Sequence, residues 1–169
     1  DRVWMRSLVP NIYFVGLATG SAIASAGLAD RVGRRAVVVG ASAVVGVVFP
    51  LSALAPSLTV YLAAKFIIGT FVMMGLIAGY TLVCELVGTA LRTRASSELG
   101  CYFQAVHSVL LALAAYALRA ASWRTQVVAV AWPYTVFAIA TLILPESPFY
   151  LLAKARYADA ESVLSRVIG

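Results

Sequence analysis

Five long apolar stretches dominate this sequence, and they restrict what the chain can fold into more than any other feature. They cover residues 7–29, 36–54, 58–87, 97–118 and 125–144. A helix that crosses the hydrocarbon core of a bilayer needs about 20 mainly apolar residues, and each stretch is close to that length or above it. We therefore predict an all-α, polytopic transmembrane helix bundle with five spans inside residues 1–144. The third stretch is longer than a bilayer requires, so its helix should tilt or project from the surface.

The composition supports the lipid bilayer as the solvent of this chain. Of 169 residues, 62% are hydrophobic and 12% are charged, whereas about 25% of the residues in a soluble domain are charged. The net charge of +6 comes mostly from basic residues between the apolar stretches, a pattern that is typical of membrane topology and argues against a nucleic-acid partner. Cys84 and Cys101 lack the spacing of a disulfide framework or a zinc site. With one histidine and no suitably spaced pair of acids, we expect no enzyme activity, no metal and no cofactor.

The loops between the apolar stretches are short, so neighbouring spans should be antiparallel, and five spans put the two chain ends on opposite sides. Eight basic residues fall on one side, namely Arg31, Arg34, Arg35, Arg92, Arg94, Lys154, Arg156 and Arg166. Four fall on the other, namely Arg2, Arg6, Arg119 and Arg124. Short cytoplasmic loops carry the excess of Lys and Arg, so we predict an external start and a cytoplasmic tail. Because the chain opens at Asp1 rather than Met, we expect it to be part of a longer protein.

Residues 145–169, after the fifth stretch, carry the signals of a short helix outside the membrane. Ser147 can cap a helix start, and Pro148 suits the first position of that helix. Glu146 would then lie near the positive end of the same helix. Apolar residues recur with helical period from Ala160 to Ile168. We therefore predict a cytoplasmic amphipathic helix that lies against the bundle.

The loop after the first stretch concentrates charge at the predicted cytoplasmic surface. Asp30 falls at the end of a helix, where the helix dipole disfavours an acid. It therefore requires a basic partner or the positive start of another helix. Gly33, between Arg31 and Arg34, supplies the backbone freedom for a sharp turn between two helices. A simpler interpretation is that this loop is a charged turn that only anchors the topology.

Glu85 and Arg92 form a second charged element, at the end of the third stretch. If the helix continues, both side chains point the same way but lie roughly 10 Å apart along its axis, too far for a direct pair. They could instead bracket a third charge, such as Arg34 or Arg35. The alternative is that they are two independent surface charges.

Four polar or aromatic residues inside the spans are candidates for a substrate path. Lys65 is the charge that lies clearly within a span, and an intramembrane lysine marks either a cation that lines a cavity or a partner of an acid on another helix. The alternative is that it snorkels toward the surface. His107, with Gln104 one turn before it, is either a packed residue or part of a polar path. Tyr80 is either aromatic packing or part of a substrate wall.

Three cytoplasmic elements of this sequence resemble signatures of the major facilitator superfamily. LADRVGRR, at residues 28–35, resembles the loop after that family's second helix. The E-x6-R element from Glu85 to Arg92 resembles the one after its fourth helix, and PESPFYLL at residues 145–152 resembles the PESPRWL element after its sixth. The resemblance identifies the five stretches as helices two to six of a partial N-terminal lobe. It implies that the first helix and the C-terminal lobe are partners that lie outside this sequence.

Within that superfamily, the chain is most similar to the organic cation/anion transporter family. GYTLVCELVG, at residues 79–88, resembles the GYTLITEFVG run of the organic cation branch. The D-x-x-W opening at Asp1 and Trp4, the AYAL run at residues 115–118 and the Trp123–Arg124 pair are also similar to that family. The similarity implies that Leu76, Tyr80 and Cys84 fall on a substrate wall.

The sequence departs from the family pattern at four positions. Ala26 stands where the loop signature begins with glycine, and Lys65 stands where the fourth helix usually has arginine. Phe149 and Tyr150 replace the Arg and Trp of PESPRWL. Because that Arg normally joins the cytoplasmic charge network, its replacement puts the strength of the gate in question.

The resemblance implies a multi-pass plasma-membrane protein that transports small organic ions, organic cations first among them, by alternating access. It also implies a cytoplasmic gate built from Asp30, Arg31, Gly33, Arg34, Arg35, Glu85, Arg92 and Glu146. Two alternatives remain open from the sequence. One is a sugar porter, which shares the loop and PESP motifs, and the other is a non-transporting membrane protein similar to vesicle glycoproteins.

Overall fold

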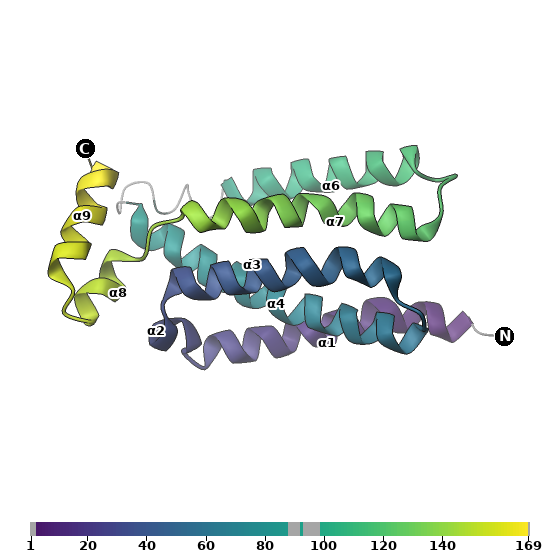
Figure 1. The fold of residues 1–169 in the computed structure, drawn as a ribbon, viewed down its shortest axis with the longest axis horizontal. Helices are drawn as coiled ribbons and strands as arrows, with labels where there is room; N and C mark the ends of the chain where they lie inside the picture. The colour runs from purple at the N-terminus through teal and green to yellow at the C-terminus, as the bar shows by residue number, and fades with distance from the viewer. Residues whose placement is uncertain (1–2, 88–91, 93–98, 169) are drawn as a thin grey trace.

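The computed structural model describes residues 3–87, 92 and 99–168, and this part of the chain is helical without strands (Figure 1). The elements in chain order are α1 (Val3–Ser25), α2 (Leu28–Val32), α3 (Arg34–Leu51), the 3-10 turn η1 (Ser52–Leu54), α4 (Leu58–Leu86), α6 (Leu99–Ala117), α7 (Trp123–Ala140), η3 (Thr141–Ile143), α8 (Pro148–Ala153) and α9 (Tyr157–Ile168). The all-α fold class predicted from the sequence is confirmed.

Four helices in the described part of the chain are long and apolar enough to cross a membrane. They cover Ser7–Ser25, Arg34–Leu54, Leu58–Leu86 and Trp123–Ile143. The predicted fourth span, residues 97–118, begins outside the described residues. Its helix, α6, has a shorter apolar part, Gln104–Ala117. Five spans therefore remain a prediction, with four of them matched by helices of sufficient length.

Two predicted segments are divided in the structure. The first stretch was expected to be helical through residue 29, but α1 ends at Ser25 because Gly27 adopts a left-handed conformation with φ 79°. Residues 28–32 then form the separate helix α2. The tail was expected to be one helix, but Ala155, with φ 57°, separates α8 from α9. Both breaks depend on single residues whose left-handed conformation apolar periodicity does not reveal.

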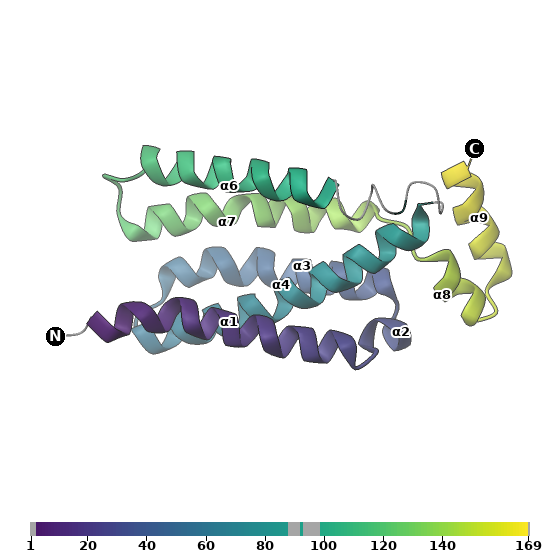
Figure 2. The ribbon, with the colours of Figure 1, turned by 180° about the vertical axis from the view of Figure 1, so that it is seen from behind.

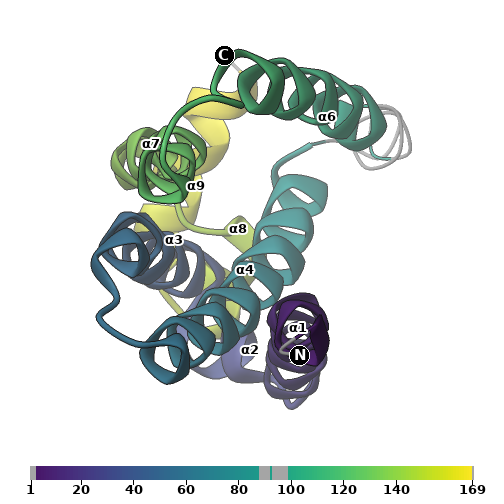
Figure 3. The same cartoon turned by 90° about the vertical axis from the view of Figure 1, so that its right-hand side faces the viewer.

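The long helices run side by side, and α8 and α9 lie beyond the end of the bundle where α2 is found (Figure 1). α4 packs against both α1 and α3, α3 packs against α7, and α7 against α6. Seen from behind, α1 lies along α4 (Figure 2), and the end-on view shows the sequence α1, α4, α3, α7 and α6 around the bundle (Figure 3). The buried core between α3 and α4 contains Val37, Val38, Met74 and Ala78.

Glycines allow α1 and α4 to approach backbone to backbone. A Cβ atom on Gly16 or Gly20 of α1 would collide with the carbonyl oxygen of Phe66 or Thr70 of α4. Small residues spaced four apart are a common device for close helix packing in membranes. Gly16, in the middle of the apolar span Ser7–Ser25, therefore packs against the N-terminal half of α4.

Candidate functional site

A charge cluster joins α2, α3 and α4 at the end of the bundle that carries α8. Arg34 is its centre. Its Nη2 lies 3.0 Å from Asp30 Oδ1, and its Nε lies 2.9 Å from Glu85 Oε2. The Arg34 and Glu85 side chains are 15% and 16% exposed, whereas Asp30 is 70% exposed. Of the two arginines that the sequence offered as a partner for Glu85, the structure brings Arg34 into the ion pair.

The two ion pairs of Arg34 differ in strength because they differ in exposure. The pair with exposed Asp30 is screened by water, and such pairs contribute at most about 1 kcal/mol. The pair with Glu85 lies in a drier environment, where removal of one partner leaves a poorly solvated charge and is far more costly. Arg34 Nε has no aligned hydrogen bond despite its 2.9 Å approach to Glu85. The attraction between them is therefore mainly the Coulomb interaction of two partly buried charges.

Ser147 connects this cluster to α8. Its hydroxyl donates a hydrogen bond to Glu85 Oε2, and Ser147 Oγ accepts one from the backbone N–H of Tyr150 at 3.3 Å. The side chain is fully buried. The local sequence pattern predicts the helix cap but not the bond to Glu85. Ser147 and Glu85 are 62 residues apart in the sequence, so no local sequence pattern predicts their contact.

Glu146 connects the starts of two helices. Its Oε1 accepts hydrogen bonds from the backbone N–H groups of Arg35 and Ser147, each at 3.0 Å. Arg35 is in the first turn of α3, where free N–H groups and the helix dipole favour a negative charge. The sequence placed Glu146 at the start of α8 alone. The structure adds its contact with the start of α3.

Gly33 is the residue around which these helices meet. Its φ of 111° lies in a region that favours glycine, and an added Cβ would lie 2.8 Å from Glu146 Oε2 and 3.3 Å from the Tyr150 ring. The Tyr150 hydroxyl also approaches the carbonyl oxygen of Arg31 at 3.5 Å. α8 is thus packed directly onto the turn between α2 and α3, and Gly33 leaves the space that this packing requires.

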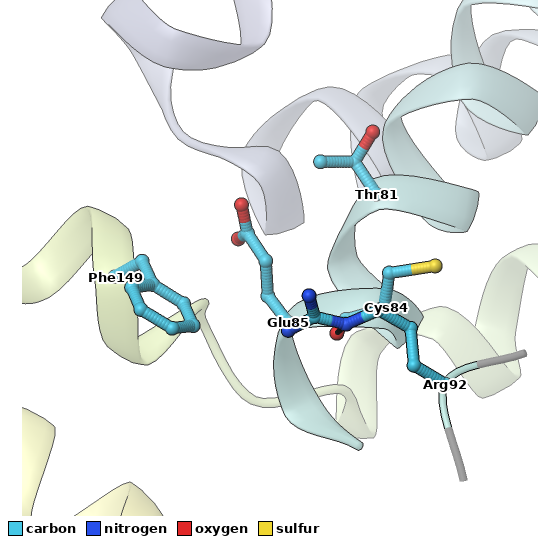
Figure 4. A pocket seen from close by; sticks show the side chains of 5 residues that line it. All are labelled: Thr81, Cys84, Glu85, Arg92 and Phe149. Atoms are coloured by element: carbon cyan, nitrogen blue, oxygen red, sulfur yellow. Dashed lines mark hydrogen bonds between the residues drawn. The ribbon is translucent and has the colours of Figure 1, made fainter. Parts of the chain in front are cut away.

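Arg92 and Phe149 line a hollow beside the charge cluster. It has a volume of about 330 Å³ and is bordered by Thr81, Cys84, Glu85, Arg92 and Phe149 (Figure 4). Arg92 Nε donates to the carbonyl oxygen of Cys84 at 2.9 Å, which satisfies one of the free carbonyl groups at the end of α4. Phe149 adds an aromatic ring to a lining that also contains the charged side chains of Glu85 and Arg92.

Lys65 lies among aromatic rings rather than beside an acid. Its Nζ is 4.5 Å from the Phe49 ring centre and 5.3 Å from that of Tyr61. Lys65 lies about two turns into α4, and Phe66, the next residue, packs against Gly16 of α1. A lysine at the bilayer centre costs about 2.5–3.5 kcal/mol on insertion scales, and one cation–π contact contributes about 0.5–2 kcal/mol. Two contacts therefore offset a large part of the cost of keeping the ammonium charged.

The other candidates for the substrate path lie on α4 and α6. Leu76 and Tyr80 are one turn apart on α4 and about half exposed, with Cys84 a further turn along the helix and less exposed. On α6, Gln104 is exposed and His107 is half-buried. The His107 ring lies 6.0 Å from the ring of Tyr134 in α7. Tyr80 and Lys65 are fifteen residues apart, roughly 22 Å along the helix axis, so they do not form one compact site.

Comparisons with known proteins identify the family. The family model described as "Sugar (and other) transporter" matches residues 3–169. Human solute carrier family 22 member 16 is 30% identical over 97% of this chain and 28% of its own length. Human organic cation/carnitine transporter 2 is 29% identical over 96% of this chain and 29% of its own length. The chain thus spans less than a third of the curated relatives it matches.

Solved structures show the same fold. The partially occluded, inward-open form of the xylose transporter XylE from E. coli aligns with a TM-score of 0.82 over 98% of this chain and 45% of that one, at 18% identity. Its inward-open form aligns with a TM-score of 0.73 at 20% identity. The resemblance to major facilitator and organic-ion transporters, first indicated by the cytoplasmic motifs, is confirmed. The chain is a multi-pass membrane segment that belongs to the Sugar (and other) transporter family.

Proposed function

We propose that this chain forms most of the N-terminal lobe of a plasma-membrane transporter that moves small organic ions by alternating access. In such transporters, the two lobes rock around a site near the middle of the membrane. Similarity to organic-ion transporters of solute carrier family 22 over nearly the whole chain supports this class of substrate. The first helix and second lobe of the full-length protein complete the cavity.

The observation that carries the proposal is the cluster around Arg34. It ties the α2–α3 turn to α4 through Glu85, and Ser147 extends the tie to α8. A set of ionic contacts that joins three segments at one end of the bundle can act as a latch, because its stability depends on all three segments being in one arrangement. We assign this latch to the cytoplasmic side and to the state in which the cytoplasmic mouth is closed.

Substrate recognition in this proposal uses α4 and α6. Tyr80 is an aromatic residue on α4, the helix that also carries Glu85. It lies almost two turns before α4 ends at Leu86. Aromatic faces bind organic cations through the negative potential of the ring. Gln104 and His107 on α6 would supply polar contacts, and Leu76 would supply an apolar wall.

Uptake by the full-length protein tests the proposal. Cells with matched surface expression would be given labelled tetraethylammonium, 4-aminobenzoate or D-xylose, as a cation, an anion and a neutral sugar. We expect saturable uptake of at least one ion and none of xylose. Uptake of xylose alone would identify a sugar porter. Absence of uptake for all three, with normal surface expression, would favour a non-transporting membrane protein.

A further inference from the structure

The hollow beside the charge cluster has the size and the lining of a small-molecule site. Its volume of about 330 Å³ lies at the lower end of the range for ligand pockets, so it suits a compact molecule. Thr81, Cys84 and Glu85 come from α4, and Arg92 follows that helix, whereas Phe149 comes from α8 (Figure 4). Two separate parts of the fold therefore border the same space.

Arg92 gives the hollow a positive charge that can bind a ligand. Its Nε donates to the carbonyl oxygen of Cys84 at 2.9 Å. The ion pairs within the described part of the chain belong to Arg34 and Arg156, so no described carboxylate neutralises Arg92. Its two Nη groups can donate parallel hydrogen bonds, a geometry that matches the oxygens of an anionic group.

Glu85 borders the same hollow, but its negative charge is already compensated. Arg34 Nε lies 2.9 Å from its Oε2, and Ser147 donates a hydroxyl hydrogen to the same oxygen. The segments that meet here carry three carboxylates and four guanidinium groups, namely Asp30, Glu85 and Glu146 against Arg31, Arg34, Arg35 and Arg92. The local net charge is therefore positive, which favours an anion over a cation.

Phe149 supplies the apolar wall of the hollow. Its side chain is 55% exposed, so a planar ligand can reach it and stack against the ring. A small anion without a ring would contact Arg92 but leave this surface uncovered. The lining therefore suits a ligand that combines an aromatic ring with one anionic group.

We propose that the hollow binds an aromatic anion from the cytoplasmic solution, a planar ring that carries a carboxylate, sulfonate or phosphate group. Such a ligand touches both α8 and the end of α4, so it binds the arrangement in which these segments lie together and stabilises that arrangement. The Ser147–Glu85 bond of the latch joins the same two segments. The ligand therefore holds the latch closed and is a regulator rather than a transported ion. This regulatory role rests on the proposed function, whereas binding to the hollow does not.

Protection of Cys84 from a thiol reagent measures occupancy of the hollow that it lines. Purified full-length protein in detergent, with its other cysteines replaced, would react with the neutral reagent N-ethylmaleimide. The probe is naphthalenesulfonate. Naphthalenesulfonamide has the same rings without the charge, and methanesulfonate has the charge without the rings. We expect naphthalenesulfonate to slow labelling about tenfold at about ten times its half-maximal concentration, and the other two compounds to have little effect at that concentration.

Two variants remove the two parts of the site separately. Arg92→Gln should raise the half-maximal concentration of naphthalenesulfonate about tenfold, since it removes a charge-assisted hydrogen bond. Phe149→Leu should raise it several-fold, since it removes the stacking partner. Each variant is compared with its own labelling rate without ligand, which separates weaker binding from a rearranged end of α4.

The control variant is Arg156→Gln. It removes an arginine from the same end of the bundle but outside the hollow, where Arg156 pairs with Asp159 at 2.7 Å, and it should leave the protection unchanged. Equal protection by the sulfonate and the sulfonamide would overturn the inference. So would undiminished protection in both Arg92→Gln and Phe149→Leu, or no protection of the wild type up to the solubility limit of the probe.

Uptake by the full-length protein tests the regulatory role. Naphthalenesulfonate should lower the maximal rate for whichever ion is transported and leave its KM unchanged. Competitive inhibition would place the anion in the transport path and overturn the regulatory role. The labelling assay needs no transport, so a protein that carries no ion would refute the proposed function, while protection of Cys84 would still decide whether the hollow binds the anion.

Discussion

Replacing Glu85 with glutamine removes the charge that holds Arg34 while keeping an acceptor for Ser147. Glutamine has almost the same size, and its amide oxygen can still accept the hydroxyl hydrogen of Ser147. Arg34, 15% exposed, would keep only the screened pair with Asp30. If the cluster closes the cytoplasmic mouth, Glu85→Gln should shift the protein toward its inward-open state.

The size of the shift follows from the exposure of the two partners. A fully exposed pair would contribute about 0–1 kcal/mol, and loss of one partner of a fully buried pair would cost about 3–5 kcal/mol. At 15% and 16% exposure, the Arg34–Glu85 pair lies between these limits. We expect about 1–3 kcal/mol, which is a change of about 5- to 150-fold in the equilibrium between the two states.

The reactivity of Cys84 can report this equilibrium. Cys84 lines the hollow beside Glu85. Maleimide labelling in inside-out vesicles measures the access of the reagent to this cysteine from the cytoplasmic side. Other cysteines in the full-length protein, Cys101 included, would be replaced. We expect Glu85→Gln to accelerate labelling at least fivefold, in line with the lower bound of the shift.

Asp30→Asn is the matched control, because it removes the other carboxylate on Arg34 at a position that is 70% exposed. It should change the labelling rate by less than about fivefold. Arg34→Gln combined with Glu85→Gln should have clearly less effect than the sum of the two single changes, since both remove the same contact. Equal rates in Glu85→Gln and wild type, or additive effects of the pair, would refute the latch.

Three further predictions test other parts of the account. In a background without native cysteines, Cys at Val32 should be labelled only from the cytoplasm and Cys at Ala120 only from outside; labelling of the Val32 position from outside in intact cells would reverse the topology. Gly33→Ala should destabilise the full-length protein in detergent by about 1–3 kcal/mol, because Gly33 has a positive φ and an added Cβ would contact Glu146. Gly40→Ala, which adds a Cβ in open space, should not destabilise it. Equal melting temperatures for the two variants would contradict the packing described. Tyr80→Ala should weaken the affinity for transported cations between several-fold and about thirtyfold, and Tyr80→Phe should have little effect; competitive uptake measures both, and unchanged affinity in Tyr80→Ala would make Tyr80 a packing residue.

The sequence predicted those parts of the fold that depend on local composition. Long apolar stretches predict helices because a bilayer leaves no other way to satisfy the backbone. The cap predicted at Ser147 is found at the start of α8, whereas the cap at Ser57, at the start of α4, is a finding of the structure. The break after Ser25 was missed because it depends on the left-handed conformation of Gly27, and glycine also occurs inside these helices without breaking them.

The site was predictable only as a set of residue types. The motifs indicated that Asp30, Glu85 and an arginine would interact, but the choice of Arg34 over Arg35 depends on how α3 is rotated against α4. The contact of Glu146 with Arg35 joins residues 111 apart in sequence. The aromatic partners of Lys65 come partly from α3, and no pattern within α4 predicts them. Helix packing, rather than local sequence, fixes these contacts.

Counterflow with purified full-length protein tests the central claim most directly, because it separates transport from binding. Liposomes loaded with unlabelled tetraethylammonium would be diluted into a trace of labelled tetraethylammonium. An alternating-access transporter of organic cations exchanges the two, so the label should accumulate transiently inside and then decline. Tyr80→Ala should reduce the initial rate at low substrate concentration. If the label never rises above the level of empty liposomes, for tetraethylammonium and for 4-aminobenzoate in the matching experiment, the protein is not a transporter of small organic ions of these kinds and the account is wrong.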